Sequence, residues 1–445
     1  MTRREAQCFD IRKLTPRETG RLMGVREQRL DQMEQSGLRP SALYKLFGNS
    51  IVVDVLAAIY RELWYHDPTE HPVQQLSLFP EPEWHLERPD RVRLVSLCSG
   101  YDSQAMALEV LARWAEQTGR EPLPWELVAW AEFDPESKAP LDRQPAVVAH
   151  KALFADTADR NLGDMTRIDW PEVIRKYGIK VYNDGDKSSN PSTSANREGE
   201  GDTSSVRGQQ RDVSVQRPHV DSEDGRSIEH DIDIRQGQLS DDSVRRANQI
   251  LTNGEIDLLT YSTPCTDISQ AGKRAGIAKD SGTRSAVLWY TEEAIRHLRP
   301  RILLQENVAA LVNQQNSADF KQWRQTVERL GYRSYWAVLN ARDYGILEAL
   351  GPVPQNRERL FMVSVRQDLC PGAPYPFPNP MPLTRTIADV LDEDVPENFF
   401  LRPESVVSFL TRNESGDQCL YRVTDHLPTA EEIREWVKET TDLTD

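Results

Sequence analysis

The chain of 445 residues is long enough for a catalytic domain and a smaller second lobe. It has no run of the about 18–20 apolar residues that a membrane span needs. Its five scattered cysteines without a CxxC spacing argue against both a disulfide framework and a zinc site. The net charge of -16 argues against nucleic-acid binding over the whole surface, but phosphate contact is local, and basic clusters remain at Lys273/Arg274 and Arg357/Arg359.

Two short motifs lie within the first 65 residues. In residues 14–18 (LTPRE), Thr15 is a suitable helix N-cap, with proline at the first helical position and glutamate at the third. The second motif, Gly48-Asn49-Ser50, precedes the apolar stretch VVDVLAAIYREL, which is predicted to be a helix with one face covering a sheet. This N-terminal part is therefore expected to pack on the domain that follows.

A proline-containing linker, residues 66–91, comes next. It carries one apolar pentapeptide, Gln75-Leu76-Ser77-Leu78-Phe79. Exposed leucine and phenylalanine in a polar segment require a docking surface. Two hypotheses stay open: the pentapeptide fastens the linker to its own domain, with Leu76 and Leu78 on one side of an extended segment, or it binds another protein.

After the linker, apolar strand-like runs alternate with helical patterns. This alternation predicts the α/β class, a mostly parallel sheet with helices on both faces and ligands at the carboxyl ends of the strands. The predicted elements are a strand over 91–98, a helix over 103–114, a strand over 126–133, a helix over 135–150, a strand over 256–262, a helix over 284–298 and a strand over 301–306. Residues 183–249 are rich in Ser, Asp, Gly, Arg and Gln without an apolar period, which predicts a disordered insertion.

The strand over 256–262 leads directly to Pro264 and Cys265. A preceding proline can hold a cysteine rigid and exposed at a strand end, as a nucleophile requires. An isolated cysteine is more often a small buried thiol. Here the following loop is polar, glycine-rich and basic, which is typical of a lid that touches phosphates and favours the nucleophile.

Two further polar motifs follow strands. Glu306 ends the strand over 301–306, where burial would raise its pKa and suit it to proton donation; a solvated strand-end carboxylate is the alternative. Arg357 and Arg359, two residues apart in QNRERLFM, share one face of a strand, which suits a phosphate or a carbonyl oxygen; an ordinary charged sheet face is the alternative.

The order of these motifs resembles that of the DNA cytosine-5 methyltransferase family, over most of the chain outside the insertion and the C-terminal tail. The resemblance implies a Rossmann-like S-adenosylmethionine-dependent methyltransferase fold with a small irregular target-recognition lobe. It implies a covalent adduct of Cys265 with a flipped-out cytosine, assisted by Glu306, Arg357 and Arg359, without a metal. The residues that it implies for S-adenosylmethionine are Cys98, Ser99, Gly100, Tyr101, Asp102, Glu132, Phe133, Asp164, Met165, Pro264, Asn49 and Ser50.

The sequence departs from the family pattern in several places. The family usually has Phe at the position of Cys98, Gly near Asp102 and Gln at the position of Thr266, and the connection before Gln355 is lengthened here by ILEALGPV. LTPRE and GNSI resemble the motifs that normally end the family's chains, yet here they come first. The sequence therefore predicts a circular permutation, with the linker joining the former ends.

The resemblance divides the chain into six parts and implies its partners. The parts are 1–65, the displaced motifs; 66–91, the linker; 92–182, the cofactor part; 183–249, the insertion; 250–384, the catalytic part; and 385–445, a partial target-recognition region with an acidic tail. The expected partner is double-stranded DNA, with a second chain as one way to complete recognition. QLSLF resembles the peptide by which bacterial DNA-processing proteins bind the replication sliding clamp.

The expected role is restriction-modification, phage self-protection or orphan methylation in the cytoplasm of a prokaryotic or phage-infected cell. Two alternatives on the same scaffold stay open: a non-catalytic or decayed DNA-binding homologue, suggested by the altered cofactor loop, and an RNA cytosine methyltransferase. The absence of GxGxxG disfavours a Rossmann oxidoreductase.

Overall fold

The computed structural model describes residues 12–67, 83–182, 253–263, 284–313, 316–347 and 351–400. Backbone contacts divide the chain into one unit of residues 1–182 with 247–445 and a second unit of residues 183–246. The second unit, which contains most of the predicted insertion, lies outside the described residues.

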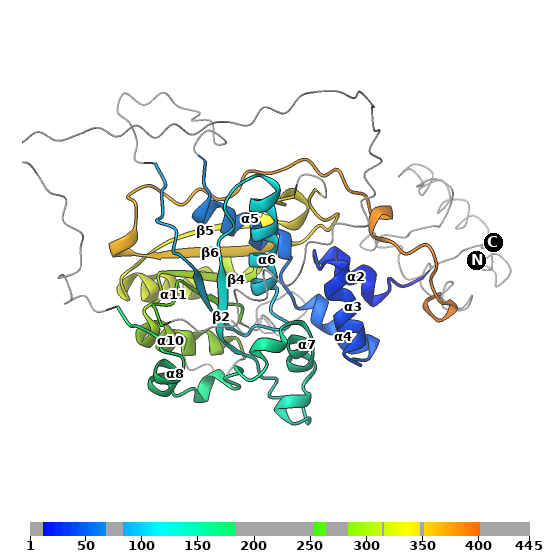
Figure 1. Cartoon of the computed structure of the whole chain (residues 1–445), viewed down its shortest axis with the longest axis horizontal. Coiled ribbons are helices and arrows are strands. Elements are labelled where there is room, and N and C mark those ends of the chain that lie inside the picture. The colour runs from blue at the N-terminus through cyan, green and yellow to red at the C-terminus, as the bar shows by residue number, and fades with distance from the viewer. Residues whose placement is uncertain are drawn as a thin grey trace, which may run out of the picture. The chain divides into compact units, whose positions relative to one another are not determined.

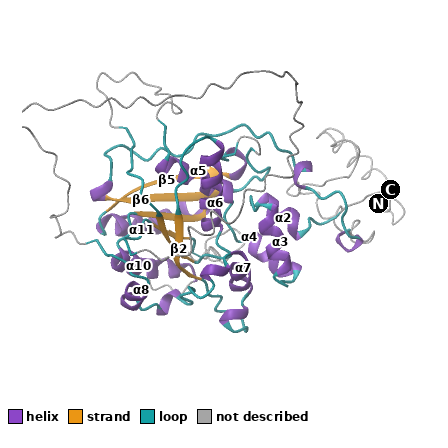
Figure 2. Cartoon of the chain, in the orientation of Figure 1, coloured by secondary structure: helices purple, strands orange, loops and turns teal. Residues whose placement is uncertain are grey.

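One six-stranded sheet forms the centre of the first unit, in the order β2-β1-β3-β4-β6-β5 (Figures 1 and 2). The strands are β1 (Val92–Leu97), β2 (Trp125–Ala131), β3 (Leu258–Tyr261), β4 (Ile302–Val308), β5 (Tyr332–Asn340) and β6 (Glu358–Arg366). Strands β1 to β4 are parallel, and β6 runs antiparallel to both β4 and β5. The mostly parallel α/β sheet predicted from the sequence is confirmed.

Helices cover both faces of the sheet and bury two separate apolar cores. Alternate residues of one strand serve opposite faces: Leu94 belongs to one core, and its neighbour Val95 belongs to the other. On the face of Leu94 lie α3 (Glu27–Gln35), α4 (Pro40–Gly48), α5 (Val53–Trp64), α6 (Ser103–Gln117) and α7 (Pro145–Leu153). On the face of Val95 lie α8 (Trp170–Lys176), α10 (Tyr290–Leu298) and α11 (Ser317–Arg329).

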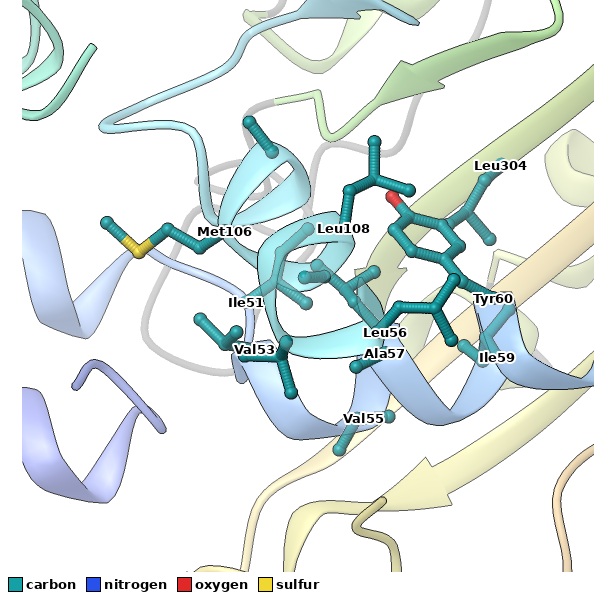
Figure 3. Packing of buried hydrophobic residues seen from close by; sticks show 14 of the residues in the cluster. Ile51, Val53, Val55, Leu56, Ala57, Ile59, Tyr60, Met106, Leu108 and Leu304 are labelled. Atoms are coloured by element: carbon teal, nitrogen blue, oxygen red, sulfur yellow. The ribbon is translucent and has the colours of Figure 1, made fainter. Parts of the chain in front are cut away.

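The N-terminal helix α5 lies against α6, the first helix after β1 (Figure 3). Nearly every residue of α5 is buried, including Leu56, Ile59 and Tyr60 with no exposed surface. Ile51, just before the helix, belongs to the same core as Met106 and Leu108 of α6 and Leu304 of β4. The predicted covering helix is confirmed. It is buried on nearly every side because an apolar surface of this size is stabilised only when it is removed from water.

The helix that begins the N-terminal segment, α2 (Pro16–Leu22), has the predicted capping box. Thr15 Oγ1 accepts from the amide of Glu18 at 3.1 Å, and the Glu18 carboxylate accepts from the amide of Thr15 at 2.6 Å. The stretch Pro40–Trp64 is long and apolar enough, by length and composition, to cross a membrane. It is two core helices here, α4 and α5, and most of it is buried.

Three predicted segments differ from the structure. The helix predicted over 284–298 is an α-helix only over Tyr290–Leu298, and Arg284–Trp289 form a 3-10 helix. The helix predicted over 135–150 begins only at Pro145, because Pro140 and Pro145 cannot continue hydrogen bonding to the preceding turns, and residues 141–143 form a single 3-10 turn. In the predicted linker, residues 83–91 pack on the domain: Trp84 is buried, with its ring against Tyr335 and Tyr375. The pentapeptide at 75–79 lies outside the described residues.

Candidate active site

The order of the sheet places the site between β1 and β3. From β1 the chain crosses to β2 on one side, and β3 pairs with β1 on the other side. The carboxyl ends of β1 and β3 therefore lie where the strand order reverses, which is the usual ligand position in such sheets. The loop after β1 is residues 98–102, and the chain after β3 leads through Ser262 and Thr263 toward Pro264 and Cys265.

The loop after β1 has an unusual backbone. Cys98, Gly100 and Asp102 all adopt left-handed conformations, with φ of 51°, 59° and 68°. The amide of Gly100 donates to Glu132 Oε2 at 2.8 Å, so the loop is held directly to the residue that follows β2. Burial raises the pKa of Glu132 to about 7, against the lowering effect of the Gly100 donor. The first two predicted cofactor segments are therefore in contact.

Asn161, which the sequence did not single out, joins the third predicted cofactor segment to these two. Its Oδ1 accepts from the amides of Glu132 at 3.1 Å and Gly163 at 2.9 Å. Asp164 then caps the short turn Met165–Arg167, and the sulfur atoms of Met165 and Cys98 lie 3.4 Å apart. An asparagine two residues before a glycine is a turn signal that could have identified this residue.

The remaining predicted cofactor residues differ in exposure. The Phe133 ring is 39% exposed, whereas the Tyr101 side chain is buried with its ring edge-to-face on Phe47. Ser99 Oγ is buried and has no hydrogen-bond partner among the described residues. Asn49 ends α4, and Ser50 lies in the turn before α5.

The ends of β3 and β4 bring Ser262 and Glu306 together. Ser262 Oγ donates to Glu306 Oε2 at 2.5 Å, and Arg359 Nε lies 3.2 Å from Glu306 Oε1. Burial raises the pKa of the Glu306 carboxyl, and the charge of Arg359 and the Ser262 hydrogen bond oppose that rise. A buried carboxyl with a raised pKa at a strand end has the properties of a proton donor.

The two arginines of the QNRER motif have different surroundings. Arg359, within β6, faces Glu306. Arg357 precedes the strand, and its guanidinium donates to the backbone carbonyls of Gly48 at 3.0 Å and Ser50 at 2.7 Å. The predicted common face is thus divided: one arginine serves the carboxylate, and the other holds the N-terminal GNSI turn.

Pro264 and Cys265 lie outside the described residues, as do Thr266, Lys273 and Arg274. The last described residue before them, Thr263, is buried beside Asn307, whose Nδ2 lies 3.4 Å from both Thr263 oxygens. The chain therefore enters the Pro-Cys segment next to the end of β4, where Glu306 lies.

Comparisons with known proteins identify the family of the chain. A family model described as C-5 cytosine-specific DNA methylase matches residues 2–64 and 224–439, more than half of the chain. The type II methyltransferase M2.ScrFI of Lactococcus lactis subsp. cremoris is 43% identical over 34% of this chain and 39% of its own. The orphan methyltransferase M.SssI of Spiroplasma monobiae is 45% identical over 24% of this chain and 28% of its own.

A third relative, the type II methyltransferase M.Bsp6I of a Bacillus species, is 33% identical over 38% of this chain and 52% of its own. This chain therefore spans about half or less of the length of each of these relatives. The family match includes both the N-terminal segment with its GNSI turn and the segment with Glu306, Arg357 and Arg359, which the structure brings together. The chain, with its Rossmann-like methyltransferase fold, belongs to the C-5 cytosine-specific DNA methylase family.

Proposed function

We propose that the protein transfers a methyl group from S-adenosylmethionine to carbon 5 of a flipped-out cytosine in double-stranded DNA. The observation that carries the proposal is the buried Glu306 carboxyl, held between Ser262 and Arg359 next to the strand that leads to Cys265. Such a carboxyl, beside a chain segment with a nucleophile, fits addition to a ring whose nitrogen must gain a proton.

Cys265, Glu306 and Arg359 have different roles in the proposed reaction. The Cys265 thiolate adds to carbon 6 of cytosine, while the Glu306 carboxyl donates its proton to ring nitrogen 3, so that carbon 5 gains an electron pair. Arg359 keeps Glu306 in place and offers its remaining N–H groups to the base carbonyl oxygen. When carbon 5 later loses its proton to solvent, the electron pair of that carbon–hydrogen bond forms the double bond between carbons 5 and 6. The carbon–sulfur bond then breaks with its electron pair on the Cys265 sulfur, and Glu306 recovers the proton of nitrogen 3.

The loop of residues 98–102 fits S-adenosylmethionine. Ser99 Oγ is buried without a partner among the described residues, and Glu132 presents a half-buried carboxyl beside the loop. We assign cofactor binding to this loop, Glu132, Phe133 and the Asp164 turn. S-adenosylmethionine would supply an electrophilic methyl group at its sulfonium sulfur.

The covalent step is tested by Cys265→Ala, with Cys370→Ala as the matched control in a half-buried cysteine outside the site. Transfer of labelled methyl groups into duplex DNA should be lost in Cys265→Ala and kept in the control, while calorimetry still detects S-adenosylmethionine. Turnover by Cys265→Ala would overturn the covalent mechanism. Cofactor binding without transfer in the parent would identify a decayed homologue, and transfer into transfer RNA alone would identify an RNA enzyme.

We also propose that the chain is a circular permutation of the family arrangement. The support is that Lys13 donates its amide to Phe399 O at 3.0 Å, and Arg12 forms an antiparallel bridge with Phe400. The segment leading into the C-terminal region thus lies beside the segment leading into α2. We place target recognition in residues 385–445, completed by a second chain if these residues do not suffice. Methylome sequencing of DNA from expressing cells would reveal the target.

We propose clamp binding for Gln75-Leu76-Ser77-Leu78-Phe79 in the bacterial cytoplasm, where a tether would raise the effective concentration on newly made DNA. Replacing Leu78 and Phe79 by alanine should abolish pull-down with a bacterial sliding clamp and leave the melting temperature unchanged. Ser77→Ala, in the same pentapeptide, serves as the control. A melting temperature lowered by several degrees, with no clamp bound by the parent, would show that the pentapeptide fastens the linker instead.

A further inference from the structure

A pair of buried ionisable side chains, Asp102 and His150, lies beneath the loop proposed to hold the cofactor. Both side chains have zero exposure, and Asp102 Oδ2 lies 3.6 Å from His150 Nδ1. Neither atom has a hydrogen-bond partner among the described residues. Asp102 belongs to the loop assigned to the cofactor, but neither side chain takes part in the proposed methyl transfer, and Asp102 stands near the position where the family usually has glycine.

Asp102 occupies a backbone conformation that disfavours most side chains. Its φ of 68° and ψ of 56° are left-handed, and it is the N-cap of α6, with Oδ1 accepting from the amide of Ala105 at 3.2 Å. Its own amide donates to Ser99 O at 2.8 Å, which closes the corner of the loop. A left-handed non-glycine residue is retained only where its surroundings hold it.

His150, on α7, is fixed in one orientation. Its ring is stacked on Trp130 with centroids 3.6 Å apart and planes 20° apart, and its Nε2 lies 3.2 Å from Thr157 Oγ1. Thr157 Oγ1 donates its single proton to Phe154 O at 3.1 Å, so it accepts from Nε2. The proton of a neutral imidazole is therefore on Nε2, and the lone pair of Nδ1 is directed at Asp102 Oδ2.

Two acceptors that face each other in a buried site repel unless a proton lies between them. We infer that the Asp102 carboxyl keeps its proton and directs it at His150 Nδ1, at 3.6 Å a contact longer than a hydrogen bond, and that this neutral acid–imidazole pair positions the left-handed corner of loop 98–102 for cofactor binding. Asp102 acts through the loop rather than by touching the cofactor. The cofactor part of the inference rests on the proposed function; the pairing itself does not.

The electrostatic surroundings agree with a neutral pair. Burial raises the pKa of Asp102 to about 7; the Ala105 amide of α6 and Ser96 of β1 oppose the rise, and Glu132 after β2 adds to it. Burial lowers the pKa of His150 to about 3. Tyr60 of α5 also lies near Asp102, and burial keeps it neutral by raising its pKa well above its usual value.

The sign of the pH effect follows from the raised pKa. A carboxyl that keeps its proton in the folded state contributes most to the free energy of unfolding at low pH. This contribution falls as the pH rises toward 7. Above that pH the pair has lost its proton, and the loop corner loses its support. If only the protonated form binds, the Kd for S-adenosylmethionine should be about tenfold higher at pH 8 than at pH 6.

Asp102→Asn separates this inference from a merely structural role. Asparagine tolerates the left-handed conformation and keeps the N-cap, and its Nδ2 donates to His150 Nδ1 at every pH. Between pH 6 and pH 8, we expect the fold-increase in Kd of Asp102→Asn to be at most one fifth of the fold-increase in the parent. Asp169→Asn, the same change at the exposed N-cap of α8, should keep the parental pH profile.

Two measurements without cofactor complete the test. Nitrogen NMR of the His150 ring should show a neutral Nε2–H imidazole at pH 6, and the melting temperature of Asp102→Asn should fall less than that of the parent from pH 5 to pH 8. A parental pH profile in Asp102→Asn, or a charged or Nδ1–H imidazole, would overturn the pair. Absence of S-adenosylmethionine binding in the parent at every pH, with the NMR result as expected, would overturn the proposed function and leave the pair standing.

Discussion

Arg357 and Arg359 show how two like residues of one short motif come to serve different purposes. Arg359 lies in β6 opposite Val308 and reaches the buried Glu306. Arg357 lies one residue before the strand and donates to two carbonyls of the turn around Asn49. One guanidinium therefore stabilises a charge in the site, whereas the other fixes backbone from the far end of the chain.

We predict that alanine substitutions separate these two roles. Arg357→Ala should lower the free energy of unfolding by about 1–3 kcal/mol, because two charge-assisted hydrogen bonds to carbonyls are lost. Arg359→Ala should have a smaller effect on unfolding and lower the rate of methyl transfer by about 10²–10³-fold, as loss of one electrostatic donor does. Urea unfolding and steady-state assays measure both effects.

Arg342→Ala is the control for this comparison, because that side chain is exposed and pairs only loosely with Asp343 at 3.5 Å. It should leave both quantities near their parental values. Equal loss of stability in Arg357→Ala and Arg359→Ala would contradict the division of roles.

At this scale the sequence predicts the chemical type of a residue better than its partner. Glu306 at a strand end was recognisable because a polar residue after an apolar strand reaches the ligand edge of a parallel sheet. The bonds from Arg357 to Gly48 and Ser50, and the pairing of Asp102 with His150, depend on contacts between distant segments, for which no local spacing gives a signal.

Among the elements, the two chain segments that flank residues 183–252 are held side by side. Ile179 forms a parallel bridge with Gly254, and Lys180 N donates to Gly254 O at 2.8 Å. Arg93, near the start of β1, also donates to the carbonyl of Gly254. These segments therefore lie at the amino end of β1, whereas the candidate site lies at its carboxyl end, about 20 Å away for a strand of six residues.

We predict that deletion of about residues 190–240 leaves the rate of methyl transfer within a few-fold of the parent. The flanking segments already meet, so a short loop can replace the deleted chain, and a segment so polar contributes little apolar burial. Solubility, melting temperature and transfer into duplex DNA are the measurements. Insoluble protein after deletion would show that the fold requires the segment.

The elements were predicted well where an apolar period ran uninterrupted, as in α6 and β1 to β4. They were predicted poorly where prolines broke a helical pattern, as before α7, and in residues 83–91, where Trp84 and Leu86 are buried despite a polar, proline-containing context. A single aromatic residue in a linker gives no period from which burial could be recognised.

For the whole molecule, the described ends of the main unit meet. Arg12 and Phe400 form a backbone bridge. In addition, Asp392 pairs with Arg21 at 2.6 Å and accepts a hydrogen bond from Thr15 Oγ1 at 3.1 Å. The buried Glu18 accepts from the amide of Asp392 at 2.7 Å. Segments from opposite ends of the sequence are thus fastened together by backbone and charged contacts.

We predict that the conventional family order can be restored. A chain that begins near residue 83, joins residue 445 to residue 1 through a short Gly/Ser linker and ends near residue 67 should fold and keep methyl transfer within a few-fold, because all described contacts are retained. The control is the parental order with the same linker placed between residues 67 and 83. Failure of the reordered chain alone to fold would contradict the proposed permutation.

The hydrogen bonds of Arg357 also join two segments that the ribosome synthesises at widely separated times. Arg357 and Gly48 are 309 residues apart in the sequence. At about 5–20 residues per second, a ribosome needs about 15–60 s to travel between them. Early in that interval α5 has been made but none of the six strands has, so its apolar surface is exposed to other nascent chains and to chaperones. The order of motifs that leaves the finished fold intact therefore lengthens the period in which the growing polypeptide is vulnerable to aggregation.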